Sequence, residues 1–239
     1  MHSPPETSVR TRGDVLLTGA TGFLGMELLA RLLQDGDRRV WALVRARCDA
    51  NANERMRAIL ASLVPDPEAV LHRVVAVAAD LTQPGLGLDP RRREQIADGV
   101  DEVIHSAASV SFSLPLEEAR EVNVEGTSRV LELAEHCAAR GGLRRFAHVS
   151  TAYVAGDRRG FRNTYEQSKW EAERVVREHG SRLPVQIFRP SIVVGHHLSG
   201  WTASFNVIYA PLRAYAAGAL RAVPGRRSAP VDILSLIHI

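Results

Sequence analysis

Short apolar runs alternate along this chain with longer segments of helical periodicity. Several of the runs are apolar on both faces of a period-2 pattern, as strands covered by helices on both sides are. The six runs span residues 14–19, 38–45, 73–80, 101–107, 144–150 and 184–190. Helices are predicted over residues 23–36, 115–141 and 168–180. This alternation predicts an α/β protein with a doubly wound parallel sheet.

The two ends of the chain depart from this pattern. Residues 1–12 are polar and proline-bearing, which predicts a disordered tail before a nucleotide-binding domain over 13–199. Beyond Gly195 the alternation stops, and we expect a smaller substrate-binding subdomain to begin over residues 200–233. The last six residues, 234–239, fit no element of the pattern. We therefore expect them to be a non-native tail on a chain that is truncated in its C-terminal subdomain.

The stretch "TGATGFLG" directly follows the first predicted strand and opens the first predicted helix. Its glycines, Gly19, Gly22 and Gly25, allow a tight turn, close approach of the backbone to a pyrophosphate, and close packing of helix on strand. The exposed N–H groups and the helix N-terminus then hold the phosphates. The context is that of a Rossmann-type dinucleotide site rather than a ligand-free turn. The remaining loop residues expected at the cofactor are Thr21, Phe23 and Leu24.

The second predicted strand ends in "LVRAR", where the residue type bears on cofactor choice. An acid at this position would bind the ribose 2′-hydroxyl of NAD, whereas an arginine accommodates the 2′-phosphate of NADP. Arg45 and Arg47 favour NADP over NAD, although arginine is common throughout this chain. Further strand ends are expected beside the adenine and along the middle of the cofactor. These residues are Asp80, Leu81, Ala107 and Ala108.

One lysine stands in a chain whose Lys+Arg total is 30, and it is Lys169 in "TYEQSKW". Residues four apart share a helix face, so its side chain should project together with that of Tyr165. A fixed ammonium at ~4 Å favours the phenolate by up to roughly 4 kcal/mol at an effective dielectric of about 20. The pair therefore predicts a phenol of lowered pKa that acts as a general acid. The alternative is two residues that share a solvated face.

A hydroxyl that holds the substrate oxygen is expected near this pair. The fifth predicted strand ends in "HVSTAYVAG", which puts Ser150 and Thr151 at the carboxyl edge of the sheet. Ligands bind at this edge in open parallel sheets. Position alone leaves both hydroxyls as candidates.

These motifs together resemble the extended branch of the short-chain dehydrogenase/reductases. The finer features "VRA", "DLTQPGLGL", "HSAASVSFSLPLEEAREVNVEGT" and "HVSTAYV" are similar to the thioester reductase and fatty acyl-CoA reductase group, with its male-sterility-type NAD-binding domain. The resemblance implies that "FRPSIVVG" borders the nicotinamide, and its residues expected there are Pro190, Ser191 and Ile192.

The resemblance also implies an activity and the catalytic residues Thr151, Tyr165 and Lys169. It implies that NADPH reduces an acyl thioester, on CoA or a carrier protein, to an aldehyde or alcohol. A sugar-nucleotide epimerase or dehydratase and a hydroxysteroid-type dehydrogenase are alternatives on the same fold. A non-catalytic NADP-sensing regulator is an alternative of another class, since fold does not fix function.

Composition bears on the class of ligand and on the cellular compartment that we expect for this protein. The net charge of +3 suits an anionic small ligand, and the scattered arginines do not suit nucleic acid. Cys48 and Cys137 lie far apart and predict free thiols in a reducing, cytoplasmic compartment. No run approaches the ~20 apolar residues of a membrane span, and no metal-ligand spacing occurs. A homodimer is one expected assembly.

Overall fold

The structure is a computed structural model that describes residues 13–34, 36–155, 160–195, 202, 209–219 and 233–234. The expected N-terminal tail lies outside these residues, as do residues 235–239 of the expected non-native tail. Much of the expected subdomain over 200–233 also lies outside them.

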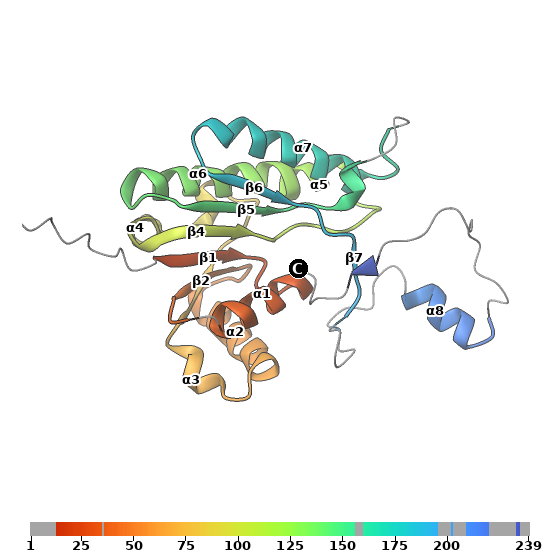
Figure 1. Ribbon diagram of the computed structural model, residues 1–239, viewed down its shortest axis with the longest axis horizontal. Helices are drawn as coiled ribbons and strands as arrows, with labels where there is room; N and C mark the ends of the chain where they lie inside the picture. The colour runs from red at the N-terminus through yellow and green to blue at the C-terminus, as the bar shows by residue number, and fades with distance from the viewer. Residues whose placement is uncertain are drawn as a thin grey trace, which may run out of the picture.

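One parallel sheet of six strands forms the centre of the protein, with strand order β3-β2-β1-β4-β5-β6 (Figure 1). From β1 the chain winds outward to β3, then returns to β4 beside β1 and winds outward to β6. This order is the doubly wound arrangement, so the predicted fold class and all six predicted strands are confirmed. The strands are β1 (Asp14–Thr18), β2 (Val40–Val44), β3 (Val74–Ala78), β4 (Val100–His105), β5 (Arg145–Val149) and β6 (Val185–Phe188).

Helices cover both faces of this sheet (Figure 1). The described helices are α1 (Phe23–Gln34), α2 (Asp49–Leu63), α3 (Pro67–Leu71), α4 (Pro90–Gly99), α5 (Leu116–Arg120), α6 (Gly126–Arg140), α7 (Thr164–Glu178) and α8 (Tyr209–Ala216). Short 3-10 turns span Pro84–Gly87, Ala152–Ala155 and His179–Ser181, and a π-helical turn spans Glu121–Glu125. The predicted helix over 115–141 is thus α5, the π turn and α6 in succession.

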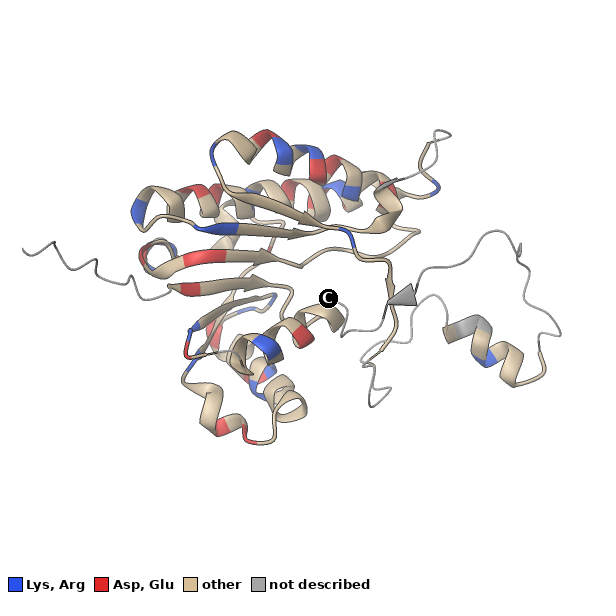
Figure 2. Ribbon diagram, in the orientation of Figure 1, with Lys and Arg blue, Asp and Glu red and all other residues tan. Residues whose placement is uncertain are grey.

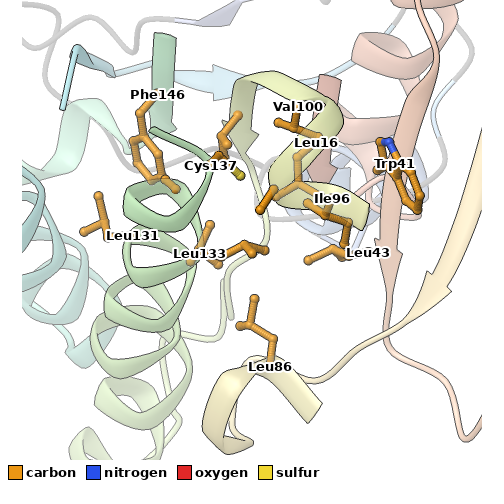
Figure 3. Close-up of a cluster of buried hydrophobic side chains, with 14 of the residues drawn as sticks. Leu16, Trp41, Leu43, Leu86, Ile96, Val100, Leu131, Leu133, Cys137 and Phe146 are labelled. Atoms are coloured by element: carbon orange, nitrogen blue, oxygen red, sulfur yellow. The ribbon is translucent and has the colours of Figure 1, made fainter. Parts of the chain in front are cut away.

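Two apolar clusters, one on each face, hold the helices to the sheet. Successive residues of β1 alternate between them: Leu16 packs with α4, α6 and α7, while Val15 and Leu17 pack with α1 and α2. Figure 3 shows the first cluster, in which side chains of α6 approach the buried Phe146 of β5. Because both faces are covered, several strands, among them β1, β2 and β3, are apolar on both sides, as the sequence pattern predicted.

A two-stranded sheet lies apart from the main one. Its strands are β7 (Ile192–Val193) and β8 (Ile233–Leu234), which pair in parallel. Leu234, which we expected to open a non-native tail, is therefore paired with Val193. Within the ranges described above, no helix combines the length and apolar character needed to cross a membrane.

Candidate active site

A cavity of about 890 Å³ lies at the carboxyl ends of the strands. The phosphate loop, the segment after β4, the end of β5, helix α7 and the segment after β6 line it. Among the described residues that line it, Lys169 is the single charged one. The predicted site residues found in the lining are Gly19, Thr21, Gly22, Phe23, Leu24, Gly25, Ala108, Thr151, Tyr165, Lys169, Pro190, Ser191 and Ile192.

The glycine loop has the form that a pyrophosphate requires. Gly19 has φ +74°, and a Cβ there would lie 2.7 Å from the backbone nitrogen of Ala107. A Cβ on Gly25 would lie 1.9 Å from the carbonyl oxygen of Gly19, so helix α1 can pack here only without a side chain. A Cβ on Gly22 would crowd only that same oxygen, at 3.3 Å, and Gly22 itself lines the cavity. The loop thus presents bare backbone and a helix N-terminus to the cavity, which fits a dinucleotide.

A buried hydrogen-bond chain fixes the segment that follows β4. The Thr127 hydroxyl donates to the carbonyl oxygen of Asn123 at 2.6 Å, so its one proton is used there. His105 Nε2, 3.0 Å from the same hydroxyl, must therefore be the protonated nitrogen. His105 Nδ1 is then the acceptor for the Thr18 hydroxyl at 2.7 Å. The donor and the acceptor of each hydrogen bond in this network are thus determined.

At the Thr18 end, this hydrogen-bond network holds the backbone that lies beside the phosphate loop. With its proton directed at His105, the Thr18 oxygen accepts from the N–H groups of Ser106 at 3.2 Å and Ala107 at 3.1 Å. Burial lowers the pKa of His105 to about 3, and the nearby Lys169 charge adds to this. The imidazole therefore stays neutral and keeps one tautomer. This explains why Ala107, expected at the cofactor, uses its N–H within the protein and is absent from the cavity lining.

Asn123, in the π-helical turn, connects the segment after β4 to helix α7. Its side-chain oxygen accepts from the Ser109 N–H at 2.8 Å, and its amide nitrogen donates to the Ser109 carbonyl at 3.0 Å. The same nitrogen donates to the Ser168 hydroxyl at 3.0 Å. A π turn is a frequent feature of functional sites because it re-aims one side chain within a helix. Here that side chain is Asn123.

Helix α7 begins at Thr164, four residues earlier than predicted, because a capping box forms at its start. The Asn163 side chain accepts from the Glu166 N–H at 2.9 Å, and the Glu166 carboxylate accepts from the Arg162 N–H at 2.9 Å. These bonds satisfy backbone donors that the first helical turn leaves free. They place Tyr165 in the first turn, where its side chain reaches the cavity.

Thr151 and Tyr165 both line the cavity, and the threonine side chain opposes the rise that burial causes in the pKa of the phenol. Ser150, the competing hydroxyl, faces the buried Glu173 and helps to keep the pKa of that carboxyl low. Arg189 donates to Glu173 at 2.8 and 2.6 Å, so this acid is firmly paired behind the site. Both hydroxyls line the cavity, and of the two it is Thr151 that affects the pKa of Tyr165, so Thr151 stays the expected partner.

The expected effect of Lys169 on the phenol is not what the structure shows. Burial raises the pKa of Tyr165, Tyr153 adds to the rise, and the Thr151 side chain opposes it. The Lys169 ammonium is directed instead to the carbonyl oxygen of Val149, at 2.8 Å, with His148 Nε2 at 3.4 Å. The prediction of a phenol pKa lowered by Lys169 is therefore wrong for this structure. The helical spacing was right, but the lysine side chain extends toward β5.

Lys169 itself is strongly affected by its position. It is 2% exposed, and burial lowers its pKa to about 8, while Glu173 one turn further along α7 opposes the shift. A lysine whose pKa is about 8 is mostly protonated at neutral pH, but a small rise in pH above that value removes its charge. Its ammonium donates to the Val149 carbonyl oxygen and, at the longer distance, to His148 Nε2, so one of its three N–H donors is left for a ligand.

The residues predicted around the adenine and the 2′-phosphate do not line this cavity. Arg45 and Arg47 are exposed at the carboxyl end of β2, and Arg47 borders a separate cavity of about 420 Å³. Hydrogen bonds from Thr82 lower the pKa of Asp80, burial opposes this, and Arg45 contributes through its charge. Leu81 packs against the cluster that holds α6. These four residues lie at the neighbouring strand ends but apart from the catalytic candidates.

Sequence reasoning missed several residues of the site. Val110 and Phe112 follow β4 and line the cavity, as does Tyr153 after β5. Asn123 and His105 hold the site from outside the lining. The available signal was the exposed apolar pair in "SVSF", which directly follows a buried strand. The partners of Asn123 and His105 lie too far away in the sequence to be read from a local pattern.

Comparison with known proteins shows the family to which the chain belongs. A family model of NAD-binding domains, described as male sterility protein, matches residues 17–237. The chain belongs to this family. The group lies in the extended branch of the short-chain dehydrogenase/reductases, which are NAD(P)-dependent oxidoreductases. The expected relationship is confirmed, and with it the expectation of a nicotinamide cofactor.

Individual curated proteins are similar to this chain. Fatty acyl-CoA reductase 1 of Mus musculus is 32% identical over 269 residues, which cover 92% of this chain and 52% of that protein. The isonitrile lipopeptide synthase of Streptomyces coeruleorubidus is 35% identical over 220 residues, 85% of this chain and 15% of that protein. The chain spans about half the length of the fatty acyl-CoA reductases that it matches.

Solved structures agree with the family assignment. The terminal R domain of the myxalamid PKS-NRPS pathway superposes with a TM-score of 0.83 at 31% identity, over 95% of this chain and 60% of that one. UDP-glucuronic acid 4-epimerase from Bacillus cereus superposes with a TM-score of 0.67 at 20% identity, over 94% of this chain and 69% of that one. The second likeness concerns the fold alone.

Proposed function

We propose that this chain carries the catalytic domain of an NADPH-dependent reductase that converts an acyl thioester, on CoA or a carrier protein, to an aldehyde or alcohol. The observation that carries the proposal is that Thr151, Tyr165 and Lys169 line one cavity beside the glycine loop, and that the described lining is uncharged except for Lys169. A thioester carbonyl is neutral and its acyl chain apolar, so both suit such a lining.

Bound NADPH would supply the hydride to the carbonyl carbon. Thr151 and Tyr165 would donate hydrogen bonds to the carbonyl oxygen as negative charge develops on it. Tyr165 then gives up its proton to that oxygen, and a phenol whose pKa is raised by burial stays protonated until this step. When the carbonyl re-forms, the carbon–sulfur bond breaks, the thiol leaves and an aldehyde remains.

Lys169 has a positioning role in this proposal. Its bond to the Val149 carbonyl fixes the ammonium at the end of β5, and the neutral His148 beside it adds no competing charge. The remaining N–H donor would hold a ribose hydroxyl of the cofactor. Arginine could not replace it, because a planar fork does not fit where a compact point charge is enclosed.

The alternatives fit the cavity less well. A sugar nucleotide would present a polar, hydroxyl-bearing ring to the catalytic candidates, whereas the lining beside them includes the apolar Val110 and Phe112. A regulator that only senses NADP would not require Thr151, Tyr165 and Lys169 together at one cavity wall.

The test of the proposed function is a substrate panel. The chain is incubated with NADPH and an acyl-CoA, an acyl carrier protein thioester, a UDP-sugar or a hydroxysteroid ketone, and NADPH oxidation and products are followed. We expect oxidation only with the thioesters, accompanied by aldehyde or alcohol. Net oxidation only with the steroid, or epimerised sugar without net oxidation, would contradict the proposal.

Cofactor choice provides a separate prediction. If Arg45 or Arg47 contacts the 2′-phosphate, its replacement by alanine removes a charge-assisted hydrogen bond worth about 1.5–3 kcal/mol. NADPH affinity should fall accordingly, while NADH affinity should stay nearly constant. Calorimetric titration of Arg45→Ala and Arg47→Ala with both cofactors measures this. Equal losses for the two cofactors in both variants would remove these arginines from cofactor selection.

A further inference from the structure

The segment after β4 presents apolar side chains to the cavity rather than to the core. Val110 is 61% exposed and Phe112 is 40% exposed, and both line the cavity. Apolar side chains gathered on a concave surface are typical of a binding site for an apolar group. The two residues belong to no helix or strand, so secondary structure does not explain their exposure.

Phe112 is in contact with the catalytic candidate. Its ring lies 5.6 Å from that of Tyr165, tilted by 38°. It also lies 6.4 Å from the ring of Tyr153 in an edge-to-face arrangement with an interplanar angle of 86°. Such separations are those of packed aromatic pairs. The three rings therefore form one aromatic wall that begins at the acid itself.

The segment that carries Phe112, from Ser109 to Leu114, is tied to helix α7 at both of its ends. On one side, Asn123 holds the backbone of Ser109 and the hydroxyl of Ser168. On the other side, the Thr164 hydroxyl donates to the carbonyl oxygen of Leu114 at 2.8 Å. Because α7 also carries Tyr165, the segment between these ties keeps its place relative to the phenol. An apolar group packed on Phe112 would therefore lie at a fixed position beside the reacting carbonyl.

We propose that Val110 and Phe112 form the subsite for the first carbons of the acyl chain, and that Phe112 selects substrates whose acyl group extends beyond the carbonyl. The inference rests on the proposed function. A chain that lies on the Phe112 ring buries its methylenes next to Tyr165, where the carbonyl oxygen is held. An acetyl group is too short to gain from this contact, whereas a butyryl group is long enough.

The test compares the binding of acetyl-CoA and butyryl-CoA to the 239-residue chain in the presence of NADP⁺, by calorimetry. The CoA portion is common to both, so the ratio of dissociation constants isolates the acyl contact. Burial of a methylene strengthens binding up to about fourfold, equivalent to about 0.8 kcal/mol. We expect butyryl-CoA to bind up to roughly 15-fold more tightly to the wild type. Phe112→Ala should reduce this ratio to within about threefold of unity, and Phe112→Leu should keep most of it.

Phe161→Ala is the matched control. Phe161 is 38% exposed and packs against Trp170 with ring centroids 5.5 Å apart, so it loses a similar ring and a similar aromatic pair. It does not line the cavity among the residues described there, and its variant should keep the wild-type ratio. An unchanged ratio in Phe112→Ala, or a ratio near one in the wild type, overturns the inference. Failure of the wild type to bind any acyl-CoA contradicts the proposed function itself.

Discussion

The amino and carboxyl edges of the six-stranded sheet differ in the charged side chains that they carry. At the amino edge, Arg38 pairs with Asp101 at 2.5 Å and with Glu102 at 2.6 Å, and Arg145 pairs with Glu102 as well. Figure 2 shows charged strand residues gathered at this edge, while the opposite ends of the strands are largely uncharged. At the carboxyl edge, hydroxyls, neutral histidines and Lys169 take their place.

This difference in charge indicates that the amino edge stabilises the fold, whereas the carboxyl edge carries the groups that bind a ligand. Burial alone would raise the pKa of Glu102, but hydrogen bonds from Arg38 and Arg145 hold it below the ordinary value. Each charge at that edge is compensated within the protein, which leaves little for a ligand. At the carboxyl edge the side chains of Tyr165 and Thr151 face a cavity. Groups that a ligand can engage are therefore concentrated at one edge.

The largest expected effect is on catalysis at the carboxyl edge. Tyr165→Phe removes the proton donor and one oxyanion contact but keeps the ring that packs on Phe112. We expect the rate of thioester reduction to fall by about a hundredfold or more, because general acid catalysis contributes 10²–10⁴. Stability and NADPH affinity should change little. A rate above a tenth of the wild type would remove Tyr165 from the mechanism.

The next effect concerns pH and the buried histidines at the same edge. His105 has a pKa of about 3, and burial together with Lys169 lowers that of His148 well below its usual value. Both bind protons in the unfolded chain near pH 6.5, so the unfolded state gains protons first as pH falls. Stability should therefore decrease below pH 6.5, by about 2 kcal/mol at pH 5 from His105, and His148 adds a loss in the same direction.

Urea unfolding at several pH values measures this effect. His105→Gln should remove one proton from the pH dependence between 6.5 and 5, whatever it does to the absolute stability. His72→Gln, an exposed position, should leave the dependence unchanged. A wild-type stability that is flat across this range would show that the imidazoles are not held neutral.

The third effect tests the amino edge. Glu102→Gln leaves Arg38 with Asp101 as its carboxylate partner and removes the Glu102 carboxylate from Arg145, at a position where Glu102 is 4% exposed. Breaking a buried pair from one side destabilises strongly, and we expect a loss of about 3 kcal/mol. NADPH affinity per folded molecule should not change. A variant that loses cofactor affinity while remaining fully stable would contradict the separation of the two edges.

Local patterns were sufficient to predict the sheet and the central parts of the site. Each strand has its own apolar run, the glycine loop is contiguous, and Tyr165 and Lys169 lie one helical turn apart. Helices α2, α3 and α4 were not predicted, because they bury few residues. Only Ala52, Met56 and Leu60 of α2 are buried, and α3 buries none. Their periodic signal is accordingly weak.

What the sequence could not supply is the set of long-range partners. His105 bonds Thr18 across 87 positions of the chain, and no local spacing reveals such a pair. The direction of Lys169 is similar: helical spacing places it beside Tyr165, but the acceptor on β5 decides where the ammonium goes. The wrong prediction for the phenol pKa arose there, because burial of the ring outweighed a charge that points elsewhere.

The most direct test of the account follows the hydride itself. NADPH carrying deuterium at the transferred position is mixed with butyryl-CoA and the chain, and the product is analysed by mass spectrometry. We predict one deuterium on the former carbonyl carbon if the product is an aldehyde and two if it is an alcohol, with free CoA as co-product and loss of this signal in Tyr165→Phe. Release of free CoA without deuterium in the organic product would contradict it, because the carboxyl edge would then hydrolyse the thioester rather than reduce it.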